Sequence, residues 1–303
     1  EAGPALGPGI GALPAGPAPL AWFGVYDRPE RGRPAPRGEA TLGALRPDVG
    51  PAESAAAVAR VREAIGRGDV YQVNYTFRLR GTFSGDPLAL YERLRAAQGG
   101  GLHALVHLGD RAVVSASPEL FLERRGDLVR SRPMKGTARR GRFAEEDESA
   151  ARALAASEKD RAENVMIVDL VRNDLGRAAR TGSVRVASLF EVERYRTVLQ
   201  LTSTVEARLA PGAGLARLFA AAFPCGSVTG APKVAATQLI ARLERSPRGV
   251  YCGAVGYVAP GGDCAFNVAI RTVELDLVRG EAIAGVGGGV TWESSAEGER
   301  DEA

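Results

Sequence analysis

The ten residues Val70–Leu79, VYQVNYTFRL, place two kinds of side chain at alternate positions. From Tyr71 onward every odd-numbered residue is apolar, and Gln72, Asn74 and Thr76 stand between them. A period of two is typical of a β-strand whose two faces meet different surroundings. The stretch therefore predicts a strand that carries three polar side chains on one face.

Helical and strand patterns follow one another irregularly on both sides of this stretch. Predicted helices are one that contains Val58, Val61 and Ile65, one around 87–96, one from Ser157 (with Asp160 as a capping partner) to about Leu175, two over 214–222 and 230–244, and a last turn near Ala296. Predicted strands are three or four runs between 103 and 132, and single runs over 183–192, 197–208, 250–258, 264–275 and 281–291. Runs of strands with helices set between hairpins favour an α+β fold over a regular βαβ series.

The chain divides into two parts by composition. Residues 1–20 are almost entirely Ala, Gly and Pro without an apolar period, and 21–50 hold one short apolar run and a loop rich in Pro, Arg and Gly. We expect 1–50 to be a flexible segment with a remnant of an N-terminal subdomain. Residues 51–303 are expected to form the catalytic domain.

Composition narrows the possible functions. A net charge of +3 over 303 residues gives no reason to expect nucleic acid or an anionic membrane as a partner. The three cysteines, Cys225, Cys252 and Cys264, form no C-x-x-C pair, and the two histidines are too few for a zinc site. Reduced cytosolic thiols are the simpler interpretation. Neither a transmembrane run nor a signal-peptide pattern is found, so a cytoplasmic location is expected.

Two residues have neighbours that could give them a chemical role. Lys135 stands in RPMKGT, where Pro133 and Gly136 could hold it in a rigid, partly desolvated turn that favours the nucleophilic neutral amine. Glu119 follows a proline in SPELF, where apolar neighbours could raise the pKa of its carboxyl and make it a proton donor. A solvated loop lysine and a salt-bridged strand-end glutamate are the commoner alternatives.

Two pairs of acidic residues share helical spacing. Asp160 and Glu163 are three residues apart, and Glu299 and Glu302 repeat that spacing near the end of the chain. Brought together, the pairs would form an oxygen-rich site for a hard cation such as Mg²⁺. Taken singly, each pair is more often a solvated helix face.

Glycine-rich segments and an arginine could bind anions. Gly226–Lys233 precedes a predicted helix and could present backbone N–H groups to an anion, although it is not a Walker A loop. Gly285–Gly289 could let the backbone approach a ligand closely. Arg271 is placed on the predicted strand 264–275 beside the small Ala269, which suits carboxylate binding, and a structural ion pair is an equal alternative.

In their order along the chain these motifs resemble the chorismate-utilising enzymes. That family includes anthranilate synthase component I, aminodeoxychorismate synthase component I, and the isochorismate and salicylate synthases, and the resemblance covers about 51–303. It runs through GDVYQVN (68–74), SPE (117–119), KGT (135–137), KDRAEN (159–164), VDLVRND (168–174), GSVTGAPK (226–233), IRT (270–272) and ERDE (299–302).

The resemblance implies a fold and a set of site residues. The fold would be α+β, with two antiparallel sheets packed orthogonally, helices on their flanks and the site between them. Mg²⁺ would bind Glu163 and Glu302, with Asp160 and Glu299 supporting it through water, and Glu119 would protonate the departing 4-hydroxyl. Substrate contacts would come from Gln72, Gly136, Thr137, Gln200, Tyr251, Arg271, Gly285, Gly287 and Gly288.

Within the family, Lys135 favours the aminodeoxychorismate synthases of para-aminobenzoate and folate biosynthesis. Those enzymes have lysine at this position, whereas anthranilate synthases typically have alanine. The resemblance implies that the Lys135 amine attacks C2 of chorismate, and that ammonia then enters at C4 and expels the lysine. Gln72 stands where isochorismate and salicylate synthases have a basic lysine, which disfavours water attack. Gln200 departs from the histidine of anthranilate synthases and several relatives.

Three hypotheses remain open from the sequence. The first is amination of chorismate at C4, and its nearest rival is ammonia addition at C2, as in anthranilate or aminodeoxyisochorismate synthases. The third is an inactive chorismate-binding paralogue. No segment resembles a glutamine amidotransferase, so we expect ammonia to come from solution or from a separate glutaminase subunit.

Overall fold

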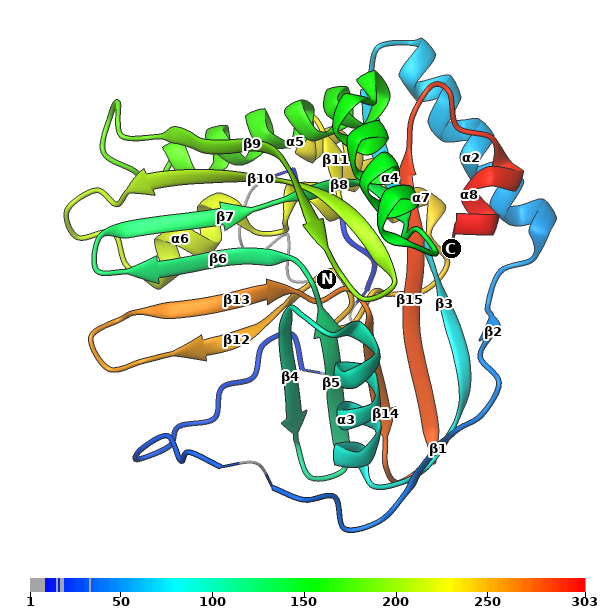
Figure 1. Ribbon diagram of the computed structural model, residues 1–303, viewed down its shortest axis with the longest axis vertical. Coiled ribbons are helices and arrows are strands. Elements are labelled where there is room, and N and C mark those ends of the chain that lie inside the picture. Colours follow the sequence, from blue (N-terminus) through cyan, green and yellow to red (C-terminus); the bar gives the residue numbers. More distant parts are fainter. Residues whose placement is uncertain (1–8, 15, 17–18, 33, 303) are drawn as a thin grey trace.

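A computed structural model describes residues 9–14, 16, 19–32 and 34–302, without the side chain of Glu302. Two antiparallel sheets form its centre. In Figure 1 the strands of one sheet run horizontally and those of the other run vertically. Helices lie against both sheets. The predicted α+β class with two crossing antiparallel sheets is confirmed.

The first sheet has eight strands built around the long β3. Its order is β1 (Ala40–Leu42), β3 (Gln72–Gly85), β15 (Glu281–Val290), β14 (Thr272–Asp276), β5 (Arg111–Ser117) and β4 (Leu102–His107), with β2 (Arg46–Pro47) and β11 (Gly230–Ala231) also paired to β3. The glycine run of β15 lies beside the polar positions of β3, with Gly287 opposite Thr76 and Gly289 opposite Asn74. The alternation in 70–79 therefore predicted this strand correctly.

The second sheet has seven strands. Its order is β12 (Ala254–Val258), β13 (Cys264–Val268), β6 (Leu120–Arg125), β7 (Leu128–Arg132), β10 (Val198–Arg208) and β8 (Met134–Arg139), with β9 (Arg185–Arg194) paired to β10. Pro133, between β7 and β8, accepts a hydrogen bond from Ser203 N at 3.1 Å, which keeps the chain against β10 across the break. Lys135 consequently lies near the start of β8.

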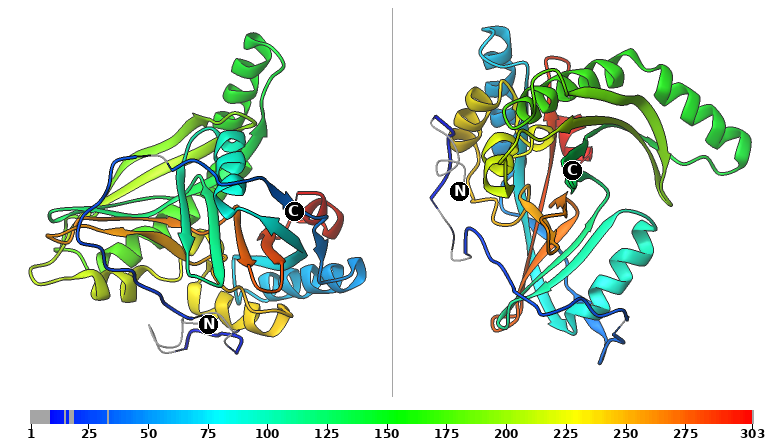
Figure 2. Two further views of the ribbon diagram at one scale, coloured as in Figure 1. Left: turned by 90° about the horizontal axis from the view of Figure 1, so that it is seen from below. Right: turned by 90° about the vertical axis from the view of Figure 1, so that its left-hand side faces the viewer.

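Each sheet buries its own set of apolar side chains against helices. The helices are α2 (Pro51–Gly66), α3 (Pro87–Gln98), α4 (Ala144–Ala156), α5 (Glu158–Gly176), α6 (Leu215–Ala222), α7 (Lys233–Leu243) and α8 (Ala296–Glu302), with a 3₁₀ turn at Gly226–Val228. One core joins α5 and α6 to β6, β10 and β13, and two others join α2 and α7 to β3, and α3 to β5 and β14. Figure 2 shows α4 and α5 following the curve of β9 and β10.

The predicted helix beginning at Ser157 is confirmed, since the Ser157 hydroxyl accepts a hydrogen bond from Asp160 N at 3.3 Å. Helix α4 was not predicted. Its first turn carries three acidic residues, Glu145, Glu146 and Asp147, and Arg140 and Arg194 hold the carboxylate of the buried Asp147. Those arginines also keep the pKa of Asp147 low, at about 2, chiefly through the Arg140 hydrogen bond. Long-range pairing of this kind leaves no periodic signal in the sequence.

Two short connections without a helix take the chain directly from one sheet to the other. The first is Pro118–Glu119, between β5 and β6, and the second is Ala269–Arg271, between β13 and β14. The prediction of one continuous strand over 264–275 was therefore wrong. Arg271 adopts a left-handed backbone with φ of 49°, which breaks the strand.

The segment before Pro51 contributes to the first sheet through β1 and β2, both paired with β3. Further upstream, the carbonyl of Gly9 accepts a hydrogen bond from Gln238 Nε2 on α7 at 2.9 Å. Among the described residues, no helix combines the length and apolar character that crossing a bilayer requires.

Candidate active site

Glu119 occupies the first crossing between the sheets and is 2% exposed. Its backbone is held by the Ser117 hydroxyl (3.2 Å from Glu119 N) and by Val268 N (3.0 Å from Glu119 O). The Ser227 hydroxyl donates to its Oε1 at 2.5 Å. Burial raises the pKa of Glu119 to about 7, against the smaller lowering effects of Ser227 and the nearby Lys135. The carboxyl can therefore hold a proton near neutral pH.

Lys135 faces the same region from β8 and is half-buried. A Cβ atom on Gly289 of β15 would lie 3.0 Å from Lys135 Nζ and 2.1 Å from Gln72 Nε2, so this glycine leaves the space that both side chains occupy. Gln72 is 1% exposed, and neither of its amide atoms has a hydrogen-bond partner among the described residues. Because a buried amide without partners is costly, this arrangement suits a polar ligand that would complete it.

Two of the four predicted metal ligands, Asp160 and Glu299, lie against glycines near this place, and Glu163 is within electrostatic reach of both. A Cβ atom on Gly136 would lie 3.1 Å from Asp160 Oδ1, and one on Gly288 would lie 2.8 Å from Glu299 Oε2. Burial raises the pKa of Glu163, nearby Lys135 and Lys159 lower it, and the Asp160 and Glu299 carboxylates raise it further. The three carboxylates therefore repel one another, as expected where a cation would bind.

The predicted metal site is only partly described. Within the described residues, no three His, Cys, Asp or Glu side chains come close enough together to hold a metal ion. The side chain of Glu302, at the end of α8, lies outside the described part of the chain. The four-carboxylate magnesium site thus stays a prediction, with Asp160, Glu163 and Glu299 on elements that approach one another.

The neighbouring strands contribute a further hydrogen-bonded pair. Gln200 of β10 lies opposite Thr137 of β8, and the Thr137 hydroxyl donates to Gln200 Oε1 at 3.2 Å. Gln200 is 5% exposed. At Gly287 the backbone has φ of 146°, and a Cβ there would lie 2.2 Å from Tyr75 O, so a side chain is excluded by β3 itself.

Arg271 stands at the second crossing, between β13 and β14. Its Nη1 donates to Gln98 Oε1 at 2.6 Å, at the end of α3. Desolvation lowers the pKa of Arg271, opposed by the nearby Tyr195. The guanidinium keeps further donors available for an anionic ligand.

Tyr251 belongs to the packed core. It is 7% exposed, and a Cβ on Gly285 would lie 2.1 Å from its ring. The guanidinium carbon of the buried Arg78 lies 5.1 Å from the centre of that ring. Gly285 is therefore required for packing against Tyr251, whatever its role toward a substrate.

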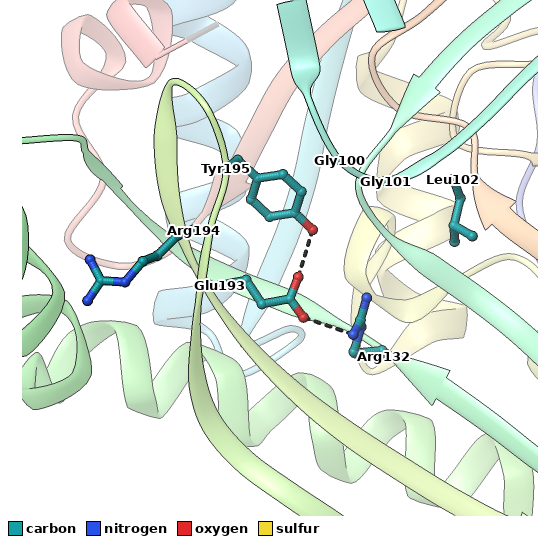
Figure 3. A pocket seen from close by; sticks show the side chains of 7 residues that line it. All are labelled: Gly100, Gly101, Leu102, Arg132, Glu193, Arg194 and Tyr195. Atoms are coloured by element: carbon teal, nitrogen blue, oxygen red, sulfur yellow. Dashed lines mark hydrogen bonds and ion pairs between the residues drawn. The ribbon is translucent and has the colours of Figure 1, made fainter. Parts of the chain in front are cut away.

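A cavity adjoins this region from the side of Tyr195 and has a volume of about 410 Å³. It is lined by Gly100, Gly101, Leu102, Arg132, Glu193, Arg194 and Tyr195, which Figure 3 shows. The Tyr195 hydroxyl bonds Glu193 Oε2 at 2.7 Å and Pro118 O at 3.3 Å, one residue before Glu119. The cavity thus adjoins the Glu119 crossing without including Lys135 among its lining residues.

The segment Gly226–Lys233 does not form the free anion site that its glycines could have given. Lys233 is held by Asp174 Oδ2 at 2.5 Å and by Ala222 O at 3.0 Å, both well buried. Its 3₁₀ turn instead supplies Ser227 to Glu119, a role that the sequence analysis missed. No sequence pattern connects residues 108 positions apart, so only the fold could have revealed this bond.

The sequence matches the chorismate binding enzyme family over residues 23–303. The chain belongs to this family. It is 43% identical over 235 residues to aminodeoxychorismate synthase component 1 of Salmonella typhimurium, covering 78% of this chain and 51% of the relative. It is 45% identical over 219 residues to anthranilate synthase component 1 of Streptomyces coelicolor, covering 71% of this chain and 42% of the relative.

A solved structure has the same fold. The crystal structure of anthranilate synthase component I from Streptococcus pneumoniae superposes with a TM-score of 0.80 at 34% identity, covering 89% of this chain and 60% of that one. The chain spans about half the length of the curated relatives described above. Family membership is thus established, and the choice among the family's reactions depends on the site residues.

Proposed function

We propose that this chain aminates chorismate at C4 to give 4-amino-4-deoxychorismate, the precursor of para-aminobenzoate in folate biosynthesis. The observation that carries the proposal is the position of Lys135 beside Gln72 and within electrostatic reach of a buried Glu119. A lysine amine can act as a nucleophile, and a carboxyl with a pKa of about 7 can act as a proton donor near neutral pH.

In the first step the neutral Lys135 Nζ forms a bond to ring C2. Both ring double bonds shift and the C4–O bond breaks. Glu119 gives its proton to the departing oxygen, which leaves as water, and its carboxylate takes up the proton that Nζ sheds. The result is a covalent adduct on Lys135, and Glu119 has returned to its starting state.

In the second step ammonia forms a bond to C4. The double bonds shift back, the C2–Nζ bond breaks, and Lys135 leaves as an amine after taking the surplus proton. The balance is chorismate plus ammonia giving aminodeoxychorismate plus water. We propose that a separate glutamine amidotransferase subunit supplies the ammonia, supported by the "component 1" name of the Salmonella relative.

We propose Mg²⁺ as the cofactor, held by Glu163 and Glu302 with Asp160 and Glu299 in support. The repulsion among the Asp160, Glu163 and Glu299 carboxylates supports this assignment. A bound Mg²⁺ would neutralise the carboxylates of the substrate and the protein and orient the ring. Arg271 provides a guanidinium for the second substrate carboxylate.

Ammonia addition at C2 is the second candidate, because an anthranilate synthase relative is about as similar as the aminodeoxychorismate synthase. In that reaction ammonia itself takes the place at C2, so Lys135 would have no covalent role. An inactive chorismate-binding paralogue would bind substrate without turnover.

Intact-mass analysis of the chain with chorismate and Mg²⁺, without ammonia, distinguishes C4 amination from C2 amination and from an inactive paralogue. We expect a mass increase equal to chorismate less one water, located on Lys135 by peptide mapping and absent from Lys135→Ala. Added ammonium should discharge the adduct and release aminodeoxychorismate. Fluorescent anthranilate formed at full rate by Lys135→Ala would overturn the C4 proposal, and chorismate binding without adduct or product would favour the paralogue.

A further inference from the structure

Glu119 does not stand alone at the crossing between the sheets. We propose that Ser227 is a positioning residue for the proton donor: its hydroxyl fixes Oε1 of Glu119, so that the carboxyl proton is carried on Oε2. The inference rests on the proposed function for its catalytic meaning, and on the geometry of three buried side chains for its physical content.

The bond between Ser227 and Glu119 is short and shielded from water. Ser227 Oγ lies 2.5 Å from Glu119 Oε1, and the two residues are 5% and 2% exposed. The 3₁₀ turn Gly226–Val228 places Ser227 there, and the Thr229 hydroxyl closes this turn on Cys225 O at 2.9 Å. Water cannot readily replace the hydroxyl at this depth, so the bond defines which carboxyl oxygen accepts.

A third side chain lies against the same hydroxyl. Cys225 Sγ lies 3.2 Å from Ser227 Oγ and is 4% exposed. A hydroxyl has one proton to donate, and Ser227 gives it to Glu119, so the Cys225 thiol must donate to Ser227 Oγ. Burial raises the pKa of Cys225 to about 12, which keeps the thiol protonated and able to donate. The three groups thus form one chain of donors that ends on Glu119 Oε1.

The other groups near the Glu119 carboxyl are a backbone N–H, a positive charge and a thiol, and Ser227 is the side chain that donates a hydrogen bond to it. From β8, the Met134 N–H donates to the carboxyl and Lys135 faces it as a positive charge. Cys225 is the further titratable neighbour whose own pKa responds to the charge of Glu119. Ser227 is therefore the side chain that distinguishes the two carboxyl oxygens, and Lys135 is the charge that favours ionisation.

A carboxyl that accepts on Oε1 holds its acidic proton on the other oxygen. Without Ser227 the ionised form would lose one of the two hydrogen bonds that it receives from Ser227 and Met134. Loss of the hydroxyl should therefore raise the pKa of Glu119 above its value of about 7 and also slow proton delivery.

Infrared titration of the free protein tests the inference without substrate. The C=O band of the protonated Glu119 carboxyl is assigned by its absence in Glu119→Gln and followed against pH. We expect Ser227→Ala to raise the pKa of Glu119 by about one unit, and Ser227→Thr, which keeps a hydroxyl, to restore the wild-type value. An unchanged pKa in Ser227→Ala, or a Ser227→Thr value equal to that of Ser227→Ala, overturns the proposal.

A second variant controls for steric crowding by the extra methyl group of Ser227→Thr. Ser227→Cys is close in size and has a weaker donor, so its pKa should fall between those of wild type and Ser227→Ala; a value outside that interval contradicts the proposal. Turnover at pH 6 should fall about tenfold in Ser227→Ala, through kcat rather than KM. If Lys135→Ala kept full turnover, the proposed function would fail while the order of pKa values in the Ser227 series would still stand.

Discussion

Two lysines of this chain each have a buried carboxyl nearby, and they differ in whether the charges touch. Lys233 Nζ contacts Asp174 Oδ2 at 2.5 Å and Ala222 O at 3.0 Å, and its side chain is 11% exposed. Lys135 lies within electrostatic reach of Glu119 and Glu163. Among the described residues it makes no hydrogen bond or ion pair.

The difference separates a structural cation from a reactive one. An amine in direct contact with a carboxylate has its charge and its donors committed. The Lys135 amine instead lies beside Gln72, whose amide has no partner among the described residues, and it can approach a ligand. The chain uses lysine rarely, at three of 39 basic positions. Arginine stays protonated in proteins and cannot act as an amine nucleophile, so lysine is needed only where its chemistry or its shape matters.

The largest effect on turnover is expected from Lys135, because a positive charge without a neutral amine should not support the reaction. Lys135→Ala and Lys135→Arg should both lower ammonia-dependent turnover of chorismate by a factor on the order of 10⁴, because neither supplies a neutral amine. Steady-state kinetics with product identified by chromatography checks this. The free energy of unfolding in urea should change by less than about 1 kcal/mol for a half-buried side chain without an ion pair. A Lys135→Arg enzyme with near-normal turnover would show that Lys135 acts only as a charge.

Removing Lys233 should cost stability instead of chemistry. Burial outweighs the attraction of Lys233 and raises the pKa of Asp174 to about 6. Lys233→Met would leave Asp174 buried without a cation, and we expect a loss of about 3–5 kcal/mol at pH 8. The loss should shrink at pH 5, where Asp174 takes up a proton.

Urea unfolding of Lys233→Met, Asp174→Asn and the double variant measures this effect. The double variant should be less destabilised than the sum of the single variants, since it leaves no unpaired charge. Equal losses at pH 5 and pH 8 would mean that the ion pair is not the cause.

The sequence allowed candidate site residues to be named, but it did not predict the side-chain contacts between distant parts of the chain. The alternation from Tyr71 to Leu79 predicted β3, because it depends on local spacing. The roles of Glu119, Lys135 and the acidic pairs were implied by the family resemblance and stay predictions. The contact of Lys233 with Asp174 and that of Ser227 with Glu119 join residues 59 and 108 positions apart. No period in the sequence reports such contacts.

The break at Arg271 shows the same limit for the fold. The apolar residues of 264–275 fit one strand, and the chain instead leaves one sheet at Val268 and joins the other at Thr272. Both halves are buried by different partners, so an apolar run alone cannot mark the crossing. Helix α4, stabilised by Arg140 and Arg194 on Asp147, was missed for a related reason.

An effect of intermediate size on the free energy of unfolding is expected from the titration of Glu119. Its folded pKa, about 7, is above the ordinary value of 4.5, so protonation favours the folded state. This contribution is fully present below pH 4.5 and is lost as pH rises through 7, an effect of about 3 kcal/mol. Glu119→Gln should therefore gain stability relative to wild type between pH 5 and pH 8. Wild-type turnover should fall above pH 7 as the acid ionises; a stability difference that does not change with pH would show that Glu119 is ionised throughout.

The smallest effect is expected at Lys159, the third lysine, which is exposed on the first turn of α5. Its charge reaches Glu163 through solvent, where screening is strong. Lys159→Arg keeps that charge, so turnover should stay within about twofold and the free energy of unfolding within about 0.5 kcal/mol. Comparison of Lys159→Arg with Lys135→Arg in the same assay tests whether arginine can replace lysine where only charge is needed. Equal damage at both positions would mean that the contrast between touching and separated charges does not explain where this chain keeps its lysines.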